Sequence, residues 1–151
     1  MAWTPVARVT GPSMAPALND GQIIGVRPLA WGGVWAGAVV LLTHLDERGS
    51  TRYVKRVAAV GGDVVTMEAG RLAVNGRSWD GRPLVAGARR EVWRVPKGHV
   101  FVVGDNPDAS SDSRSWEQPF VPLTDVQGVI LRRRWPASRP RRAGSRLPWR
   151  R

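Results

Sequence analysis

Short apolar runs separated by turn residues make up most of this chain. Glycine, proline, asparagine and aspartate interrupt the runs, and in several of them apolar and polar positions alternate, as on a half-buried strand. No segment keeps a 3.6-residue period long enough to indicate a substantial helix. The pattern predicts strands over residues 22–27, 38–42, 51–60, 64–67, 71–74, 91–95, 100–103 and 128–133. We therefore expect an all-β fold of antiparallel strands with little helix.

Four segments between these strands are predicted to be turns or loops. Residues 28–36 form a loop with exposed aromatic side chains, and residues 44–50 are polar and turn-like. Residues 78–90 show no periodicity, which indicates an excursion from the sheets. Residues 104–118 form a polar loop rich in side chains that bond to the backbone.

Composition fits a single domain. The chain has 151 residues, of which 42% are hydrophobic, enough for one core. It lacks cysteine, so neither disulfides nor thiolate metal sites can form. Its two histidines, His44 and His99, do not suggest a histidine-rich metal site. We expect no cofactor.

The formal net charge of +11 is concentrated at one end of the chain. Residues 132–151 hold nine arginines and no acidic residue, whereas the preceding part is close to neutral. We therefore expect a folded domain over 1–136 and a basic, disordered tail over 137–151. Nucleic acid binding is disfavoured because the body has no basic stripe. The tail is either a solvated segment or a contact with an anionic membrane surface, where Trp135 and Trp149 would suit the interface.

A constrained turn near the N-terminus offers the first candidate reactive group. Ser13 lies between Gly11-Pro12 and Met14, with Pro16 three residues further on. Glycine permits unusual backbone angles and proline fixes φ, so the turn is rigid. Two interpretations stay open at this point: an ordinary surface turn, and a serine nucleophile that needs a base elsewhere.

Lysine usage indicates where that base lies. Of 23 basic residues only Lys55 and Lys97 are lysines, and arginine cannot lose its proton in a protein. Lys97 stands in a Pro-Lys-Gly turn, but Lys55 lies inside an apolar strand. Burial would lower the pKa of Lys55, which would let its neutral amine accept a serine proton. The alternative is an edge-strand lysine in a salt bridge.

The loop that begins at Gly104 is the third feature. Its acidic residues miss the spacing of a calcium loop, and the sixth position is not glycine. The loop is either purely structural or supports a neighbouring site through a pair between Asp112 and Arg114.

Together these segments resemble the type I signal peptidase family. The resemblance is carried by Gly11-Pro12-Ser13-Met14-Ala15-Pro16, Tyr53-Val54-Lys55-Arg56-Val57 with Gly61-Gly62-Asp63, Val74-Asn75-Gly76, and Gly104-Asp105-Asn106 with Ser110-Ser111-Asp112-Ser113-Arg114. Their order and rough spacing match over about residues 10–136. The fold that this implies is the twisted, all-β catalytic domain of the family.

The resemblance also implies roles for individual residues. Ser13 matches the nucleophile, and Lys55 matches the general base. Ser110 matches the serine that orients the lysine, and Asp112 with Arg114 matches the supporting ion pair. In the turn, the N–H of the nucleophile would bind the oxyanion. Gly11 stands where some members carry a second hydroxyl donor, and Pro12 and Met14 would shape the pocket.

The implied activity is a serine endopeptidase that removes signal or leader peptides from preproteins after small residues. Two alternatives stay open: a soluble maturation peptidase for one precursor, such as nickel-type superoxide dismutase, and a repressor-like or nucleic-acid-binding protein that uses the basic tail. The longest apolar run, 34–42, is far below the ~20 residues that span a bilayer. The family resemblance implies a membrane-associated, extracytoplasmic location, and a cytoplasmic one is the alternative.

Overall fold

Strands and tight turns form nearly all of the molecule, as the alternating pattern predicts. The structure is a computed structural model and describes residues 5–83, 85, 87 and 89–131. Eleven strands and three short 3-10 helices, and no α-helix, occur within these residues. The prediction of an all-β fold with little helix is therefore confirmed. The expected tail at 137–151, together with Trp135 and Trp149, lies outside the described residues.

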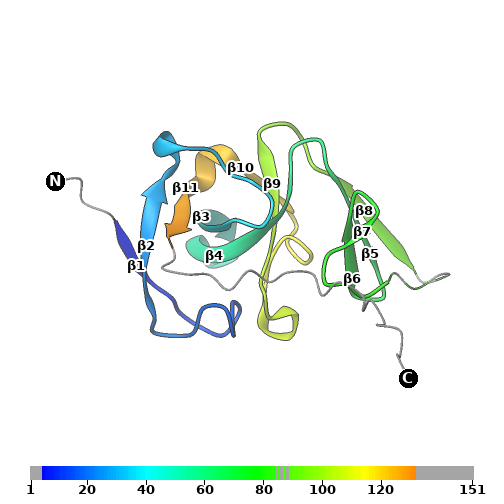
Figure 1. Ribbon diagram of the computed structural model, residues 1–151, viewed down its shortest axis with the longest axis horizontal. Helices are drawn as coiled ribbons and strands as arrows, with labels where there is room; N and C mark the ends of the chain where they lie inside the picture. The colour runs from blue at the N-terminus through cyan, green and yellow to red at the C-terminus, as the bar shows by residue number, and fades with distance from the viewer. Residues whose placement is uncertain (1–4, 84, 86, 88, 132–151) are drawn as a thin grey trace, which may run out of the picture.

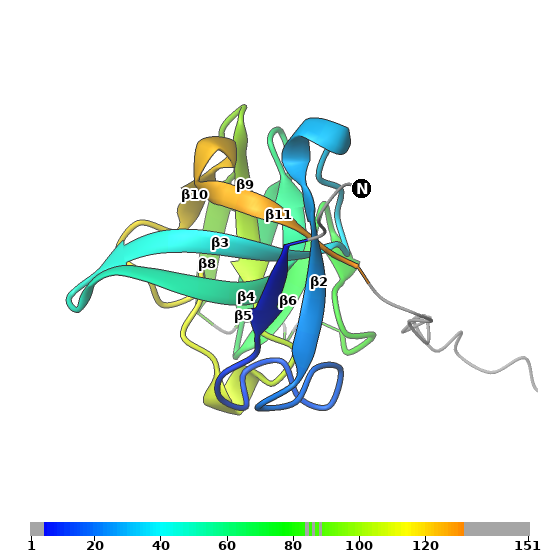
Figure 2. The ribbon, with the colours of Figure 1, turned by 90° about the vertical axis from the view of Figure 1, so that its left-hand side faces the viewer.

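A seven-stranded antiparallel sheet forms the larger part of the fold (Figure 1). Its spatial order is β1-β2-β11-β3-β4-β9-β10. The strands are β1 (Val6–Arg8), β2 (Ile23–Pro28), β11 (Val126–Leu131), β3 (Val39–Asp46), β4 (Gly49–Val60), β9 (His99–Val103) and β10 (Phe120–Pro122). β3 and β4 form the long hairpin that projects to one side in Figure 2.

A four-stranded sheet lies beside the larger one, at the right of Figure 1. Its order is β7-β6-β5-β8, from β7 (Arg77–Ser78), β6 (Arg71–Val74), β5 (Val64–Glu68) and β8 (Arg90–Arg94). All four strands fall between β4 and β9 in the chain, although β4 and β9 pair directly in the larger sheet. The smaller sheet is thus an insertion between two neighbouring strands.

The predicted turn over residues 44–50 is wrong. β3 continues to Asp46 and β4 begins at Gly49, with Leu45 opposite Ser50, so only two residues form the turn. Polar residues occupy strand positions here because the hairpin tip extends beyond the core. The short strands β1, β7 and β10 were not predicted either, since two or three residues carry no readable alternation.

Three apolar clusters stabilise the two sheets. The first packs one face of β3 and β4 and includes Val40, Leu42 and Val57. The second lies on the opposite face, where Val39 and Leu41 meet residues that follow β1. The third fills the space between the sheets, and its aromatic members are Phe101, Trp93, Trp79 and Phe120.

The three 3-10 helices occupy connections between strands. They are η1 (Leu29–Trp31), η2 (Pro107–Ala109) and η3 (Leu123–Asp125). The first lies in the predicted aromatic loop, where Trp31 and Trp35 are 59% and 54% exposed. Neither side chain belongs to the core, as the sequence analysis expected of this loop.

Candidate active site

The Ser13 turn connects β1 to β2 and is anchored by its neighbours. Gly11, at a φ of +84°, donates its N–H to Oδ1 of Asp20 at 2.9 Å. Met14 and Leu18 are buried in the second cluster, and the N–H of Leu18 donates to the carbonyl of Met14. Ser13 itself is half-buried. The turn therefore presents the serine at the surface of a fixed loop, with Met14 packed beneath it.

The main chain of this turn is docked on the loop after β9. The N–H of Asn106 donates to the Ser13 carbonyl at 2.9 Å, and its side-chain amide donates to the Pro12 carbonyl at 3.2 Å. A Cβ added to Gly104 would lie 2.7 Å from the Ser13 carbonyl oxygen and 2.1 Å from Oγ of Ser110. Ser13 and Ser110 thus approach the same point, and only a glycine fits between them.

Lys55 is buried on the inner face of β4, with 2% of its surface exposed. It lies opposite Val40 on β3, and its Nζ is 5.5 Å from the centre of the Tyr53 ring. Nζ donates a hydrogen bond to Oγ of Ser110 at 2.9 Å. Burial lowers the pKa of Lys55 to about 8; the Arg114 charge adds to this effect and the Asp112 charge opposes it.

Asp112 connects three groups around the lysine. Its Oδ2 accepts hydrogen bonds from Oγ of Ser110 at 2.6 Å, from the N–H of Gly104 at 2.8 Å and from Nη2 of Arg114 at 2.6 Å. Burial raises the pKa of Asp112, but hydrogen bonds from Arg114, Ser110 and Gly104 outweigh this effect and lower it below the usual value. The predicted pair of Asp112 and Arg114 is present, and Asp112 is an ionised acceptor.

The structure brings Lys55, Ser110, Asp112 and Arg114 into one hydrogen-bonded cluster, with Ser13 beside it. Within the described residues, the Lys55 amine bonds to Ser110 rather than to Ser13. Ser13 reaches the cluster through its carbonyl, by way of Gly104 and Asn106. The alternative was an edge-strand lysine in a salt bridge. The salt bridge is wrong, because the buried amine bonds to the Ser110 hydroxyl and forms no ion pair among the described residues.

An aromatic group beside Lys55 was not predicted from the sequence. Trp116 stacks on His44 with ring centroids 3.8 Å apart and lies 5.3 Å from the Tyr53 ring. Tyr53 donates its hydroxyl proton to Asp46 at 2.5 Å. Burial lowers the pKa of His44 despite the opposing charges of Asp46 and Asp125, which favours the neutral ring. If the predicted strand 38–42 had been extended through His44, the sequence would have suggested that His44 lies close to Tyr53.

The sequence analysis also missed an ion pair between β4 and the Gly104 loop. Nε and Nη2 of Arg56 each donate to a carboxylate oxygen of Asp105 at 2.7 Å. Nη1 of Arg56 donates to the Gly37 carbonyl at 2.8 Å. Arg56 thereby links β4, the segment before β3 and the Gly104 loop, on which the Ser13 turn is docked.

No helix among the described residues is long and apolar enough to cross a bilayer.

Comparisons with known proteins agree with this geometry. The family described as "Signal peptidase, peptidase S26" matches residues 1–135. The mitochondrial ATP-independent inner membrane protease subunit 1a of Arabidopsis thaliana is 39% identical over 132 residues, which cover 85% of this chain and 68% of that protein. Signal peptidase IB of Staphylococcus aureus is 30% identical over 152 residues, covering 86% and 77%.

A solved structure supports the fold. The crystal structure of a signal peptidase I from Enterococcus faecalis V583 superposes with a TM-score of 0.51 and 24% identity, covering 66% of this chain and 98% of that one. At this identity the similarity concerns the fold. The match over 1–135 and the two sequence relatives establish the rest: this chain belongs to the signal peptidase family, peptidase S26, and is a serine peptidase.

Proposed function

We propose that this protein is a serine endopeptidase that removes N-terminal signal or leader peptides from preproteins, with Ser13 as nucleophile and Lys55 as general base. The observation that carries the proposal is the buried Lys55 amine, whose pKa of about 8 leaves much of it neutral in mildly alkaline solution. Cleavage after small residues follows from family membership and forms part of the proposal.

The proposed reaction needs no group beyond these residues and water. The Lys55 amine takes the proton from Oγ of Ser13 while Oγ attacks the scissile carbonyl. The tetrahedral intermediate collapses to an ester on Ser13, and the Lys55 ammonium returns its proton to the leaving amine. Lys55 then takes a proton from water as the water oxygen attacks the ester, and it returns that proton to Oγ of Ser13 as the acid product leaves.

The Ser13 turn supports oxyanion binding by its backbone. Among the described residues none accepts a hydrogen bond from the Ser13 N–H, so this donor is available to the oxyanion. Gly11, two residues earlier, has no hydroxyl to add a second donor. Ser13 must approach Nζ during reaction, as expected because catalytic hydrogen bonds often tighten only when substrate binds.

An unpaired strand edge beside Lys55 supports peptide binding. β4 pairs with β3 from Gly49 to Arg56, but with β9 only from Arg56 to Val60. Over residues 49–55 its second edge therefore has no strand partner in the described part of the chain. An extended peptide that added to this edge would pass Lys55.

We also propose membrane association on the extracytoplasmic side. The support is family membership together with the nine arginines of 132–151, which would be attracted to anionic lipid. Binding of the full chain to anionic vesicles tests this part. Loss of that binding on truncation after residue 131 is the expected result, and unchanged binding would contradict it.

Cleavage of a preprotein panel by wild-type and variant chains tests the activity. We expect Ser13→Ala and Lys55→Ala to abolish cleavage. Lys97→Ala, which alters the other, exposed lysine, should leave it unchanged and is the matched control. Full proteolysis by Ser13→Ala would refute the nucleophile assignment. Cleavage of one precursor only, such as that of nickel-type superoxide dismutase, would favour a dedicated maturation peptidase.

A further inference from the structure

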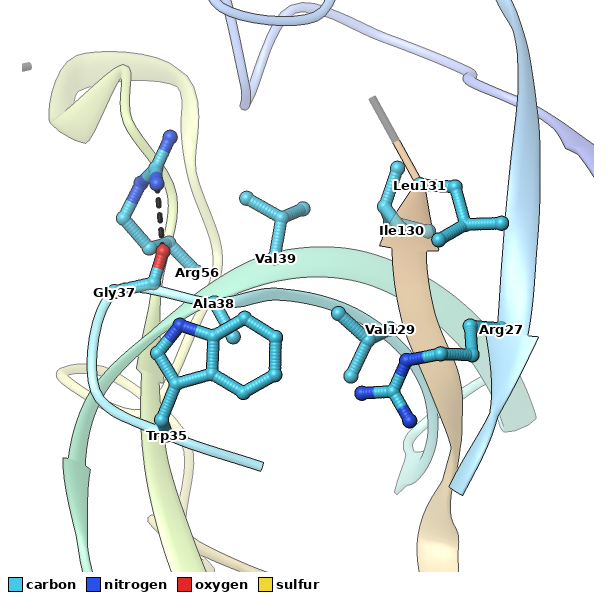
Figure 3. Close-up of a pocket in the computed structure, with 9 residues that line it drawn as sticks. All are labelled: Arg27, Trp35, Gly37, Ala38, Val39, Arg56, Val129, Ile130 and Leu131. Carbon is cyan, nitrogen blue, oxygen red and sulfur yellow. Dashed lines mark hydrogen bonds between the residues drawn. The ribbon is translucent and has the colours of Figure 1, made fainter. Parts of the chain in front are cut away.

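A groove of about 300 Å³ opens beside the candidate active site, between the ends of β2, β3 and β11 (Figure 3). Apolar side chains such as Val39, Ile130 and Trp35 form most of its walls. Two guanidinium groups, those of Arg27 and Arg56, also line it, and no acidic side chain does. The groove is thus apolar and positively charged.

The two arginines differ in how their charge is balanced. Arg56 is paired with Asp105. Arg27 donates to the Gly33 carbonyl at 3.2 Å and lies 5.9 Å from the centre of the Trp35 ring, but it forms no ion pair with any described carboxylate. Its Nη1 is buried without a hydrogen-bond partner among the described residues. The groove therefore carries a positive charge that no described carboxylate balances.

Residues of the groove wall also support the Ser13 turn. Val39 and Ile130, which line it, pack in the same cluster as Met14. Asp105, the partner of Arg56, precedes Asn106, whose N–H binds the Ser13 carbonyl. The wall of the groove therefore contacts the residues that support the Ser13 turn.

We propose that the groove binds an acidic side chain of the peptide substrate, with its carboxylate on Arg27 and its methylene groups against Trp35. This inference rests on the proposed function. The unpaired edge of β4 ends at Lys55, and the groove begins at the next residue, Arg56. Arg56 thus belongs both to the end of this edge and to the wall of the groove. Trp35 is 54% exposed, so its ring is accessible to a side chain that enters the groove.

Matched peptides with glutamate or glutamine at each position near the scissile bond provide the test. We expect wild-type kcat/KM to favour glutamate about tenfold at one position, as for a hydrogen-bonded charge. Arg27→Met should abolish this preference, so that the glutamate and glutamine peptides are cleaved at equal rates. Arg27→Glu should favour lysine at the same position. The matched control is Arg77→Met, which removes an exposed arginine of the smaller sheet.

Equal rates for glutamate and glutamine at every position would overturn the proposal and leave the peptidase assignment intact. An Arg27→Met variant that kept the preference would overturn it too. If Arg27→Met instead lost only binding to anionic vesicles, the groove would be a lipid site and the proposal wrong. If no peptide were cleaved, the proposed function would fail. Arg27-dependent binding of the glutamate peptide, followed by tryptophan fluorescence, would then test the groove separately.

Discussion

The Nζ amine of Lys55 donates a hydrogen bond to Oγ of Ser110, 2.9 Å away. The one hydroxyl proton of Ser110 is directed to Asp112 at 2.6 Å. Asp112 is an ionised acceptor, because its hydrogen bonds lower its pKa in spite of its burial. Ser110 can therefore only accept from the lysine. The pair orients the amine and leaves the lone pair of its neutral form free for another proton.

Replacing Ser110 should separate the orientation of the Lys55 amine from the proton transfer that the amine performs. We expect Ser110→Ala to lower kcat on the order of 10–100-fold, because the amine loses its anchor while Ser13 and Lys55 remain. The control is Ser111→Ala, because among the described residues the Ser111 hydroxyl bonds to the indole of Trp116 and not to Lys55. Steady-state kinetics check both. Equal losses in the two variants would show that the loop as a whole, and not Ser110, matters.

Gly104 should tolerate no side chain. In Gly104→Ala the new Cβ would lie 2.1 Å from Oγ of Ser110 and 2.7 Å from the Ser13 carbonyl oxygen. We expect a loss of about 1–3 kcal/mol in the free energy of unfolding, as for other overpacked sites, together with loss of cleavage. Gly33→Ala, whose Cβ would meet nothing within 4 Å, should retain both. Urea unfolding and a cleavage assay measure the two effects, and an active, stable Gly104→Ala variant would contradict this geometry.

The pH dependence of cleavage should report on the aromatic group beside Lys55. Wild-type kcat/KM should rise with pH through about 8, where the buried amine loses its proton. Trp116→Ala should raise this apparent pKa toward 10.5, because water would reach Tyr53 and Lys55. Activity would then fall near neutral pH and recover in alkali. Trp31→Ala, at an exposed site, should leave the profile unchanged. A Trp116→Ala profile identical to wild type would contradict the shielding role.

Lys55 should destabilise the fold in a pH-dependent way. Its pKa is about 8 in the folded chain, against 10.5 for an ordinary lysine. Between these pH values the unfolded chain binds more protons, so stability rises with pH. Below pH about 8 we expect Lys55→Met to be more stable than wild type by about 3 kcal/mol. This advantage should shrink as the pH approaches 10.5. Chemical unfolding across this range measures it, and a constant difference would contradict the shift.

The larger features of the fold could be predicted from the sequence because strand alternation is a local signal. The segments 51–60 and 71–74 correspond to β4 and β6. The polar hairpin tip at His44 and the two-residue strand β7 could not be predicted, since their pairing is decided by partners distant in the sequence.

The candidate site could be predicted where the type of residue and its neighbours indicate its environment. Lys55 stands out because it is a lysine within an apolar strand, and Asp112 because it lies in a dense polar loop. Nothing local indicates that Arg56 pairs with Asp105 or that Trp116 stacks on His44. Those contacts depend on how β3, β4 and the Gly104 loop come together in three dimensions.

The chain leaves the larger sheet to form the smaller one and re-enters it at a neighbouring position, since Val60 lies opposite Val100. Residues 61–98 therefore form an insertion whose length does not affect the pairing of β4, which carries Lys55, with β9, which leads to Gly104. Sequence changes on its outer face can alter what the protein contacts without moving the reacting groups. The smaller sheet cannot be removed entirely, because Phe101 packs against Trp93 of β8 and would then be uncovered.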